Sequence, residues 1–232
     1  RSLQNTWKLG DVRCRLTHIQ ADPYAPLSTM SIRIPMVETR IPEEYWDNST
    51  KVVALCDFIH RVVLNEVKDH ESDVGDGNSG LIHMEEVSPC ILRRSAVQIK
   101  KSELEIRIGI GLPGERRKIM ARLALETLGF KIPEIWTKCA YWINLDQSAL
   151  RDHLRVYQNQ VLYRKQLEDH NLIAWIANGS VLARSEGLKQ TPLEEGVVPF
   201  EAPETMSVTL KNLAGEPVIG MGISKGLTLI AG

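Results

Sequence analysis

Residues 220–232 read Gly-Met-Gly-Ile-Ser-Lys-Gly-Leu-Thr-Leu-Ile-Ala-Gly, and this stretch decides the fold class. Its second half, Leu227–Ala231, is an apolar run that ends at Gly232, a pattern typical of a buried strand. In nucleotide-binding folds such a strand leads into a GxxxxGK[ST] loop, whose backbone N–H groups surround phosphates at a helix N-terminus. Only the strand and the first glycine are present here, and taken alone the run is that of an ordinary strand.

The composition indicates an intracellular, soluble protein of one domain or one and a half. The chain has 232 residues, 43% of them hydrophobic, and a formal net charge of −1, so its bulk charge points neither to nucleic acid nor to a membrane. No apolar run approaches the roughly 18 residues of a membrane span. The cysteines are too dispersed for a zinc site and are expected to be reduced thiols: Cys14, Cys56, Cys90 and Cys139.

Alternating apolar residues predict strands in the first part of the chain. These cover residues 11–20, 28–36, 96–100 and 103–110, the last two joined as a hairpin by Lys101-Ser102. The prolines of Asp22–Pro26 predict a turn between the first two strands. A buried stripe at three- and four-residue spacing predicts a helix over Lys51–Lys68, capped by Ser49 or Thr50.

Helices dominate the expectations for the second part. They are Glu115–Leu128 closed by Gly129, Pro133–Trp142, and Asp146–Glu168. A hairpin is predicted across Asn178-Gly179, from Leu172–Ile176 to Ser180–Ala183. Prolines, glycines and glutamates over residues 187–203 place a domain boundary near residue 195, and strands resume at residues 206–210, 218–222 and 227–231. The expected class is α/β in the α+β sense, with a mixed-sheet domain over 1–195 and further strands over 196–232.

Positive charge gathers in one part of this otherwise neutral chain. The candidates for contact with a polyanion are Arg93, Arg94, Lys100, Lys101, Arg116, Arg117, Lys118 and Arg122. The predicted helix places Arg116, Arg117 and Lys118 in its first turn, where the helix dipole disfavours cations. A solvated charged surface is the alternative interpretation. Arg151, Arg155, Arg164 and Lys165 on the longest helix would extend the basic surface.

Two other features are candidates for ligand contact. The loop Gly75-Asp76-Gly77-Asn78-Ser79-Gly80 resembles a degenerate phosphate loop, but it lacks the lysine, and its aspartate would repel an anion. Aromatic residues that could stack on bases are equally typical of a core: Trp136, Tyr141, Trp142, Tyr157, Tyr163 and Trp175. No paired carboxylates, metal ligands or nucleophile–base set can be located from spacing.

Several stretches together resemble the predicted ATPases of the ABC class, a soluble group distinct from transporter subunits. These are His18–Pro26, Gly77–Gly80, Gly109–Pro113 followed by Arg117-Lys118, Val198–Glu204 and, most clearly, Gly220–Ile230. The resemblance covers nearly the whole chain. In the family the last stretch leads into a loop ending in Gly-Lys-Ser-Thr.

The resemblance implies an ABC-type ATPase core that begins near residue 196 and is cut at the phosphate loop, where Gly232 would contact the nucleotide. It implies ATP and Mg²⁺ as cofactors of the full-length protein and a homodimer that sandwiches nucleotide. Family members are tied to RNA processing and mitochondrial RNA editing, so RNA, an RNA-processing complex and a mitochondrial location are the implied partners and place. No membrane is implied.

Two departures from the family pattern limit these implications. Asn78 stands where the family's glycine-rich loop has lysine, and no aromatic residue occurs between Glu201 and Gly232 to stack on adenine, Phe200 being the nearest. Because the phosphate-binding lysine is absent, the chain by itself is expected to be inactive as an ATPase. The alternative to an RNA-binding domain is a structural or dimerisation domain that positions the ATPase cores without touching nucleic acid.

Overall fold

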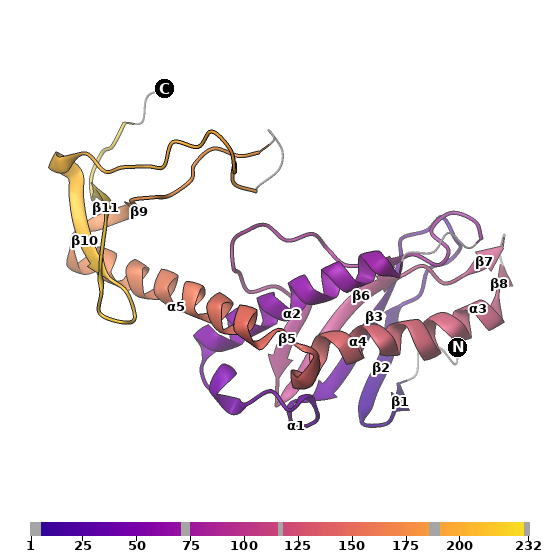
Figure 1. The fold of residues 1–232 in the computed structure, drawn as a ribbon. Coiled ribbons are helices and arrows are strands. Elements are labelled where there is room, and N and C mark those ends of the chain that lie inside the picture. The colour runs from indigo at the N-terminus through magenta and orange to yellow at the C-terminus, as the bar shows by residue number, and fades with distance from the viewer. Residues whose placement is uncertain (1–5, 71–74, 116–117, 186–190, 230–232) are drawn as a thin grey trace. The chain divides into compact units, whose positions relative to one another are not determined.

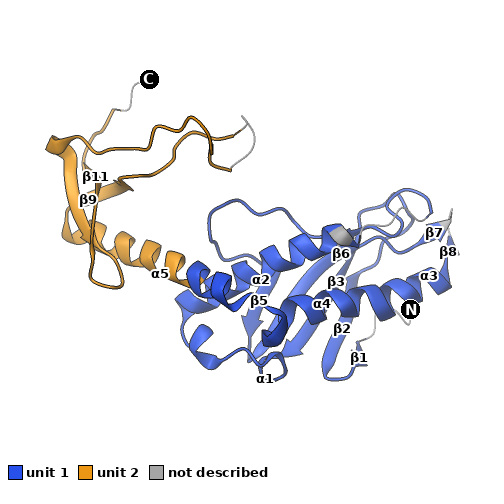
Figure 2. Cartoon of the chain, in the orientation of Figure 1, with its two compact units in different colours: residues 1–153 blue, residues 154–232 orange. Residues whose placement is uncertain are grey.

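The computed structural model describes residues 6–70, 75–115, 118–185 and 191–229. The chain divides into two compact units, residues 1–153 and 154–232 (Figure 2). Helix α5 (Gln147–Asp169) begins in the first unit and ends in the second. The composition change near residue 195 lies inside the second unit.

An antiparallel sheet of six strands is the frame of the first unit (Figure 1). The strands are β1 (Trp7–Leu9), β2 (Val12–His18), β3 (Ser28–Pro35), β4 (Ile82–His83), β5 (Val97–Lys100) and β6 (Glu103–Ile110). Their order is β1-β2-β3-β6, and β6 pairs along its other edge with β5 at one end and β4 at the other. The expected strands and the hairpin at Lys101-Ser102 are confirmed, and both turn residues have positive φ angles, 50° and 59°.

Helices cover one face of this sheet. In chain order they are α1 (Met36–Thr39), η2 (Glu43–Tyr45), α2 (Ser49–Asp69), α3 (Ala121–Glu126), η3 (Thr127–Lys131), α4 (Ile132–Ala140) and η4 (Trp142–Asn144). Figure 1 shows α2 and α4 side by side over the sheet, and the two helices contact each other. Leu55 and Ile59 of α2 and Ile32 and Ile106 of the sheet are at most 1% exposed, so the core lies between these layers.

The predicted helix over residues 51–68 is confirmed, but its capping residue is different. Asn48 is the N-cap: its side-chain oxygen accepts a hydrogen bond from the Lys51 N–H at 3.0 Å. Ser49 and Thr50, the two expected caps, lie inside the first turn. The first N–H groups of a helix have no acceptor within the helix, and the Asn48 side chain supplies an acceptor for one of them. This hydrogen bond fixes where α2 begins.

The helix expected over Glu115–Leu128 is wrong at both ends. Its first part forms a short hairpin of β7 (Gly114–Glu115) and β8 (Lys118–Ile119), and the helix begins only at Ala121. Gly129 does not end it, because α3 continues through a π-helical segment, η3, into α4. Thr127 and Leu128 are buried in that segment, so tertiary packing overrides the glycine stop signal.

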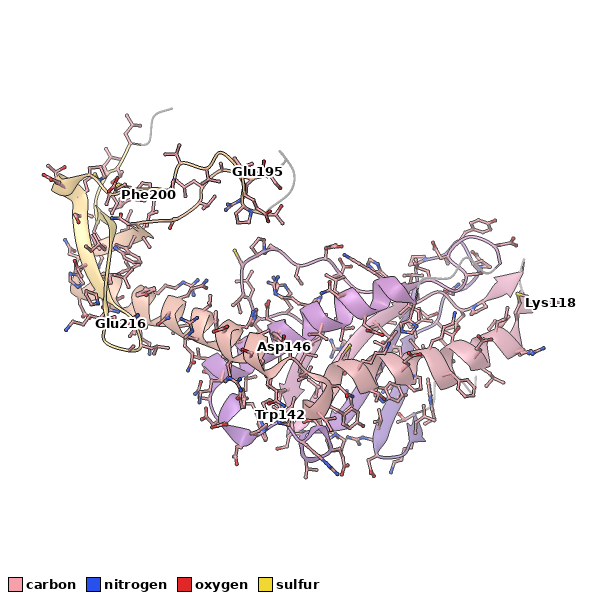
Figure 3. The ribbon with its side chains drawn as sticks, in the orientation of Figure 1. Lys118, Trp142, Asp146, Glu195, Phe200 and Glu216 are labelled. Atoms are coloured by element: carbon pink, nitrogen blue, oxygen red, sulfur yellow. The ribbon has the colours of Figure 1, made fainter. Side chains whose placement is uncertain are left out.

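The second unit combines the end of α5 with a three-stranded sheet and the 3-10 turn η5 (Glu204–Met206). The strands are β9 (Leu172–Ala177), β10 (Ser207–Lys211) and β11 (Pro217–Ser224), in the order β10-β11-β9. The predicted long helix is confirmed, and Asp146, labelled in Figure 3, accepts hydrogen bonds from the N–H groups of Ser148 and Ala149 at its start.

Two strand predictions in this unit are corrected. The hairpin across Asn178-Gly179 is absent: β9 pairs with β11, and residues 180–183 are not in a strand. The Asn178 N–H donates to the Ile219 carbonyl, and the Gly179 N–H donates to the Phe200 carbonyl. These two hydrogen bonds direct the chain away from β9 instead of folding it back as a hairpin. Of Leu227–Ala231, residues 227–229 are not in a strand, and Leu227 and Leu229 are 103% and 90% exposed. The remaining residues lie outside the described part of the chain.

In the described residues, no helix combines the length and apolar character needed to cross a membrane.

Candidate nucleic-acid interface

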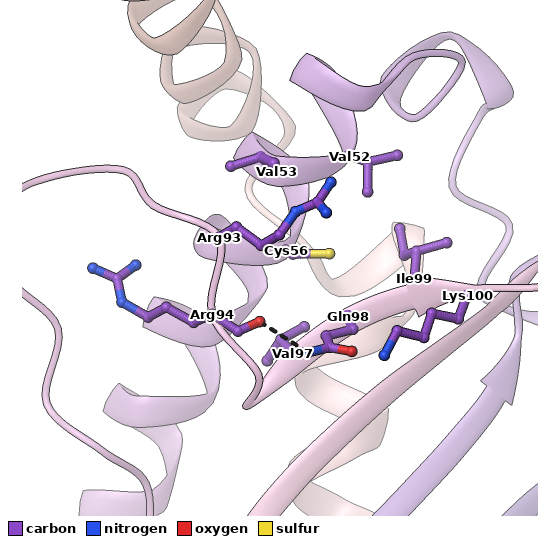
Figure 4. Close-up of a pocket in the computed structure, with 9 residues that line it drawn as sticks. All are labelled: Val52, Val53, Cys56, Arg93, Arg94, Val97, Gln98, Ile99 and Lys100. Atoms are coloured by element: carbon purple, nitrogen blue, oxygen red, sulfur yellow. Dashed lines mark hydrogen bonds between the residues drawn. The ribbon is translucent and has the colours of Figure 1, made fainter.

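Three of the predicted polyanion contacts line one cavity of about 250 Å³ between α2, residues 93–94 and β5 (Figure 4). Arg93 and Lys100 are exposed, whereas Arg94 is partly buried. The other lining residues are Val52, Val53, Cys56, Val97, Gln98 and Ile99. None of these nine residues is acidic, so the cavity combines an apolar wall with the positive charge of Arg93 and Lys100.

Two neutral polar side chains also line this cavity. The Gln98 Nε2 atom donates to the Arg94 carbonyl oxygen at 3.3 Å, and its Oε1 atom is buried with no hydrogen-bond partner among the described residues. Burial raises the pKa of the Cys56 thiol to about 12, despite a hydrogen bond with the Ile99 backbone. The thiol is therefore neutral near pH 7, and the glutamine oxygen is a buried acceptor whose hydrogen-bonding capacity is unused among the described residues.

Arg94 is held by a buried carboxylate. Asp57 of α2 is inaccessible to solvent and forms ion pairs with Arg94 and with Arg61, the latter at 2.7 Å from Nε to Oδ2. Arg94 also donates to the Cys90 carbonyl oxygen at 3.0 Å. The guanidinium of Arg94 therefore has fewer N–H groups left for a phosphate than the exposed Arg93.

The same carboxylate anchors the start of α5. His153 Nε2 lies 3.1 Å from Asp57 Oδ2, and the His153 ring packs edge-on against Phe58. Burial by itself raises the pKa of Asp57, but hydrogen bonds from His153 and Arg61 and the charges of Arg61 and Arg94 lower it to about 2. Asp57 is thus ionised across the physiological range and joins α2, residues 92–94 and α5 within the first unit.

The remaining predicted residues are spread over other elements. Lys101 is exposed in the β5–β6 turn, and Lys118, labelled in Figure 3, is exposed in β8. Placing Lys118 in the first turn of a helix was therefore wrong, and the dipole argument does not apply to it. Arg122 is exposed in the first turn of α3. Arg116, Arg117 and Gly232 lie outside the described residues.

The glycine-rich loop at residues 75–80 is a structural junction. Backbone N–H groups of Asp76, Asn78 and Gly80 donate to the carbonyl oxygens of Gly114, Pro23 and Gly111 at 3.3, 2.8 and 2.8 Å. The buried Ser79 hydroxyl is hydrogen bonded to Gly114. Because these amides point into the protein, the loop does not present them to a phosphate.

Most of the aromatic candidates are packed against other side chains. Trp136 is 4% exposed, the Trp142 and Tyr45 rings have centroids 5.0 Å apart, and the Tyr163 and Trp175 rings 5.1 Å apart. These rings contribute to packing, so base stacking on them is not supported by their positions.

Potential metal ligands gather once in the described residues, at Glu66, His70 and Glu134. Lys138 forms ion pairs with both glutamates, with its Nζ atom 3.1 Å from Glu134 Oε1. The protein itself thus supplies the positive charge at this cluster.

Basic residues that the sequence interpretation missed lie on the face of the six-stranded sheet opposite the helices. Arg13, Arg15 and Arg33, with Ser31 and two threonines, line a hollow of about 110 Å³. The polar residues that alternate with apolar ones along β2 and β3 were the feature of the sequence that could have indicated this hollow. Their gathering depends on strand register, which the sequence did not specify.

Comparisons with known proteins agree with this architecture. Residues 1–142 match the family model described as ATPase of the ABC class N-terminal, and residues 146–232 match a P-loop domain model, ABC_ATPase. The first match spans more than half of the chain. The protein therefore belongs to the family of ABC-class ATPases. No curated protein matches the chain.

Membership of this family implies that the protein binds a nucleotide, in the usual case with Mg²⁺. Such a site needs a lysine and a hydroxyl after a glycine-rich loop, and the chain contains no Gly-Lys-Ser or Gly-Lys-Thr. The glycine-rich loop at residues 75–80 does not fit a triphosphate, because its amides are engaged within the protein.

Proposed function

We propose that this protein is an RNA-binding ABC-class ATPase in which residues 1–153 hold RNA, and in which ATP binding and hydrolysis rearrange a homodimer during RNA processing or editing. One observation carries the RNA part: exposed Arg93 and Lys100 flank a cavity without acidic lining residues. A mitochondrial location and a wider RNA-processing complex belong to the same proposal.

The cavity suits one ribonucleotide. Its aliphatic wall of valines and isoleucine can lie against a base. Arg93 and Lys100 would pair with the adjacent phosphates. Lys101, Lys118 and Arg122 extend the exposed positive charge, and Arg94 supports the cavity wall through Asp57. Contacts from Arg116 and Arg117 remain predictions.

The test is RNA affinity measured by fluorescence anisotropy at several salt concentrations. The double variant R93E/K100E should weaken binding at least about tenfold, and it should flatten the plot of log K against log [salt] by about 1.4, since each single-strand phosphate contact contributes about 0.7. The matched control K68E/K211E makes the same charge change at exposed lysines outside the cavity and should change affinity less than about threefold. Equal affinity for the wild type and R93E/K100E would rule out this interface.

The ATPase part has a separate readout. The 232-residue chain by itself should release no phosphate from ATP, because it has no Gly-Lys-Ser or Gly-Lys-Thr. Phosphate release is measured with and without Mg²⁺, and turnover that depends on Mg²⁺ would show that another lysine supports hydrolysis.

A second candidate function is a dimerisation domain that positions the ATPase cores and binds no nucleic acid. Exposed apolar residues favour it: Leu125 of α3 is 70% exposed and Phe130 of η3 is 72% exposed. Light scattering distinguishes the two candidates. If L125S/F130S converts a dimer to a monomer and the wild type does not bind RNA at low salt, the second candidate is correct.

A further inference from the structure

The six-stranded sheet has one face against helices and one face of polar side chains. In β2, β3 and β6 the inward positions include Cys14, Ile32 and Ile106, which are paired in register and at most 1% exposed. Residues opposite one another on neighbouring strands share a face. Arg13 is therefore on the outward face with Arg33 and Glu105.

Register brings cations from five strands to this outward face. They are Lys8, Arg13, Arg15, Arg33, Lys100 and Arg107, with two carboxylates, Glu103 and Glu105. Six cations against two anions make a strongly positive face on a chain whose net charge is −1. None of these outward positions holds an aromatic residue, so this face offers charge without a stacking platform.

A hollow of about 110 Å³ lies at the centre of this charge. It is lined by three arginines and three hydroxyl-bearing residues: Thr6, Arg13, Arg15, Thr17, Ser31 and Arg33. Arg15 is exposed and has no ion pair among the described residues. Arginine forks are donors that recognise phosphate oxygens. The Ser31 and Thr17 hydroxyls already donate within the protein, to Glu105 and to the Thr29 carbonyl oxygen.

The two carboxylates hold the arginines in place. Glu105 is 6% exposed. Its Oε1 atom accepts from the Ser31 hydroxyl at 2.6 Å and from Arg33 at 3.2 Å, and its Oε2 atom accepts from Arg107 at 2.9 Å. Glu103 pairs with Arg13. Burial raises the pKa of Glu105, but these hydrogen bonds and the arginine charges lower it overall. Both carboxylates therefore orient guanidinium groups, and Arg15 adds unpaired charge.

We propose that this hollow is a phosphate-binding site that seats a phosphodiester of the bound RNA. The inference rests on the proposed RNA-binding function and assigns it a second contact surface, which is centred on Arg15 and shares Lys100 with the cavity beside α2. Because the face offers cations but no aromatic side chain, it recognises the backbone and does not discriminate between base sequences.

The experiment compares R15Q/R33Q and R15Q with the wild-type chain and with the control K68Q/K211Q. Anisotropy is measured with a short single-stranded RNA and with a methylphosphonate oligomer of the same sequence, whose linkages are uncharged. R15Q/R33Q should weaken RNA binding about tenfold and flatten the salt plot by about 0.7, the value of one single-strand phosphate contact. R15Q, which removes no ion pair of the described residues, should weaken it about threefold, whereas K68Q/K211Q should match the wild type.

The source of the phosphate is tested in the same experiment. The methylphosphonate oligomer should bind wild type and R15Q/R33Q with equal affinity, because neither can use the hollow to hold an uncharged linkage. A second arm titrates inorganic phosphate and follows Arg15 by NMR. If inorganic phosphate shifts the Arg15 signal while R15Q/R33Q binds RNA like the wild type, the hollow takes free phosphate and the RNA assignment is overturned.

The failure of this inference is distinguishable from the failure of the proposed function. A wild-type chain that binds no RNA overturns the proposed function. A wild-type chain that binds RNA through Arg93 and Lys100, with R15Q and R15Q/R33Q unaffected in circular-dichroism spectrum and in affinity, overturns the phosphate site alone.

Discussion

The two units of the chain differ in how much apolar surface they bury. In residues 1–153 the strands and α2 enclose many large side chains that are less than 2% exposed, among them Met30, Ile34 and Leu104. In the described residues of 154–232 the buried apolar side chains are Leu154, Leu172 and Leu210. The first unit therefore has a core of its own, whereas the second relies on a small sheet packed on one helix.

Hydrogen bonds join α5 to the chain around β10 in the second unit. Gln166 of α5 exchanges two hydrogen bonds with the Lys211 backbone, at 2.8 and 2.9 Å, and Asn159 accepts from the Leu213 N–H at 2.9 Å. Side chains such as Ile219 are 50% exposed. From this contrast we expect residues 1–153 to be the more stable unit and the strands of the second unit to open at lower free energy.

The largest expected effect is on the core of the first unit. Ile106→Ala should lower its free energy of unfolding by about 3–4 kcal/mol, since Ile106 is 1% exposed. Ile219→Ala in the second unit should cost less than about 1 kcal/mol, because half of that side chain is already in water. Urea titration followed by amide hydrogen exchange in each unit measures both values. Equal costs would remove the difference between the units.

The next effect tests the buried carboxylate. Asp57→Asn leaves Arg61 and Arg94 without their anion and should destabilise the first unit by about 3 kcal/mol at pH 7. Because the folded pKa of Asp57 is lowered from 3.8 to about 2, its contribution is present above pH 4 and is lost as the pH falls through 2. About 2 kcal/mol of the difference between wild type and variant should therefore disappear over that interval.

A matched carboxylate provides the control for this effect. Asp47 pairs with Lys51 at 2.9 Å, but both side chains are partly exposed, so Asp47→Asn should cost less than about 1 kcal/mol. The fluorescence of Trp175, the tryptophan of the second unit, should report the same unfolding for Asp57→Asn as for the wild type. Loss of both units together in this variant would show that they fold as one.

The smallest effect concerns the loop junction in the first unit. A Cβ atom at Gly111 would lie 1.6 Å from the Asn78 carbonyl oxygen, so Gly111→Ala should displace the loop at residues 75–80 and cost about 2 kcal/mol. Gly129→Ala is the matched control: nothing lies within 4 Å of its Cβ position, and alanine should gain about 0.5–1 kcal/mol in the helical segment. Thermal unfolding measures both. A neutral Gly111→Ala would mean that the junction is loose.

Local patterns predicted much of the frame. The alternation in β2 and β3, the hairpin at Lys101-Ser102 and the buried stripe of α2 all follow from side-chain periodicity, which is a property of nearby residues. The start of α3 and the continuation of the helix through Gly129 did not follow from local patterns, because β7 pairs with β8 ahead of α3 and Thr127 and Leu128 are buried in the π-helical segment. The pairing of β9 with β11 depends on contacts between residues more than forty positions apart, such as Ala177 with Gly220.

The candidate site shows the same difference between features that depend on nearby residues and features that depend on contacts between distant residues. Arg93, Arg94 and Lys100 were predicted because they are close in the sequence, and they do line one cavity. Arg15 and Arg33 were not predicted as a site, because only the register between β2 and β3 brings them to the same hollow. The partner of Arg94 was also missed, since Asp57 lies 37 positions earlier in the sequence and outside the predicted apolar stripe of α2.

The most direct test of the account maps where RNA lies on the chain. RNA containing 4-thiouridine is crosslinked to the 232-residue protein, and the modified peptides are identified by mass spectrometry. Crosslinks are expected in the first unit, in peptides that contain residues 13–33 and 93–107. Crosslinks confined to residues 154–232, or RNA bound with no crosslink in the first unit, would contradict it.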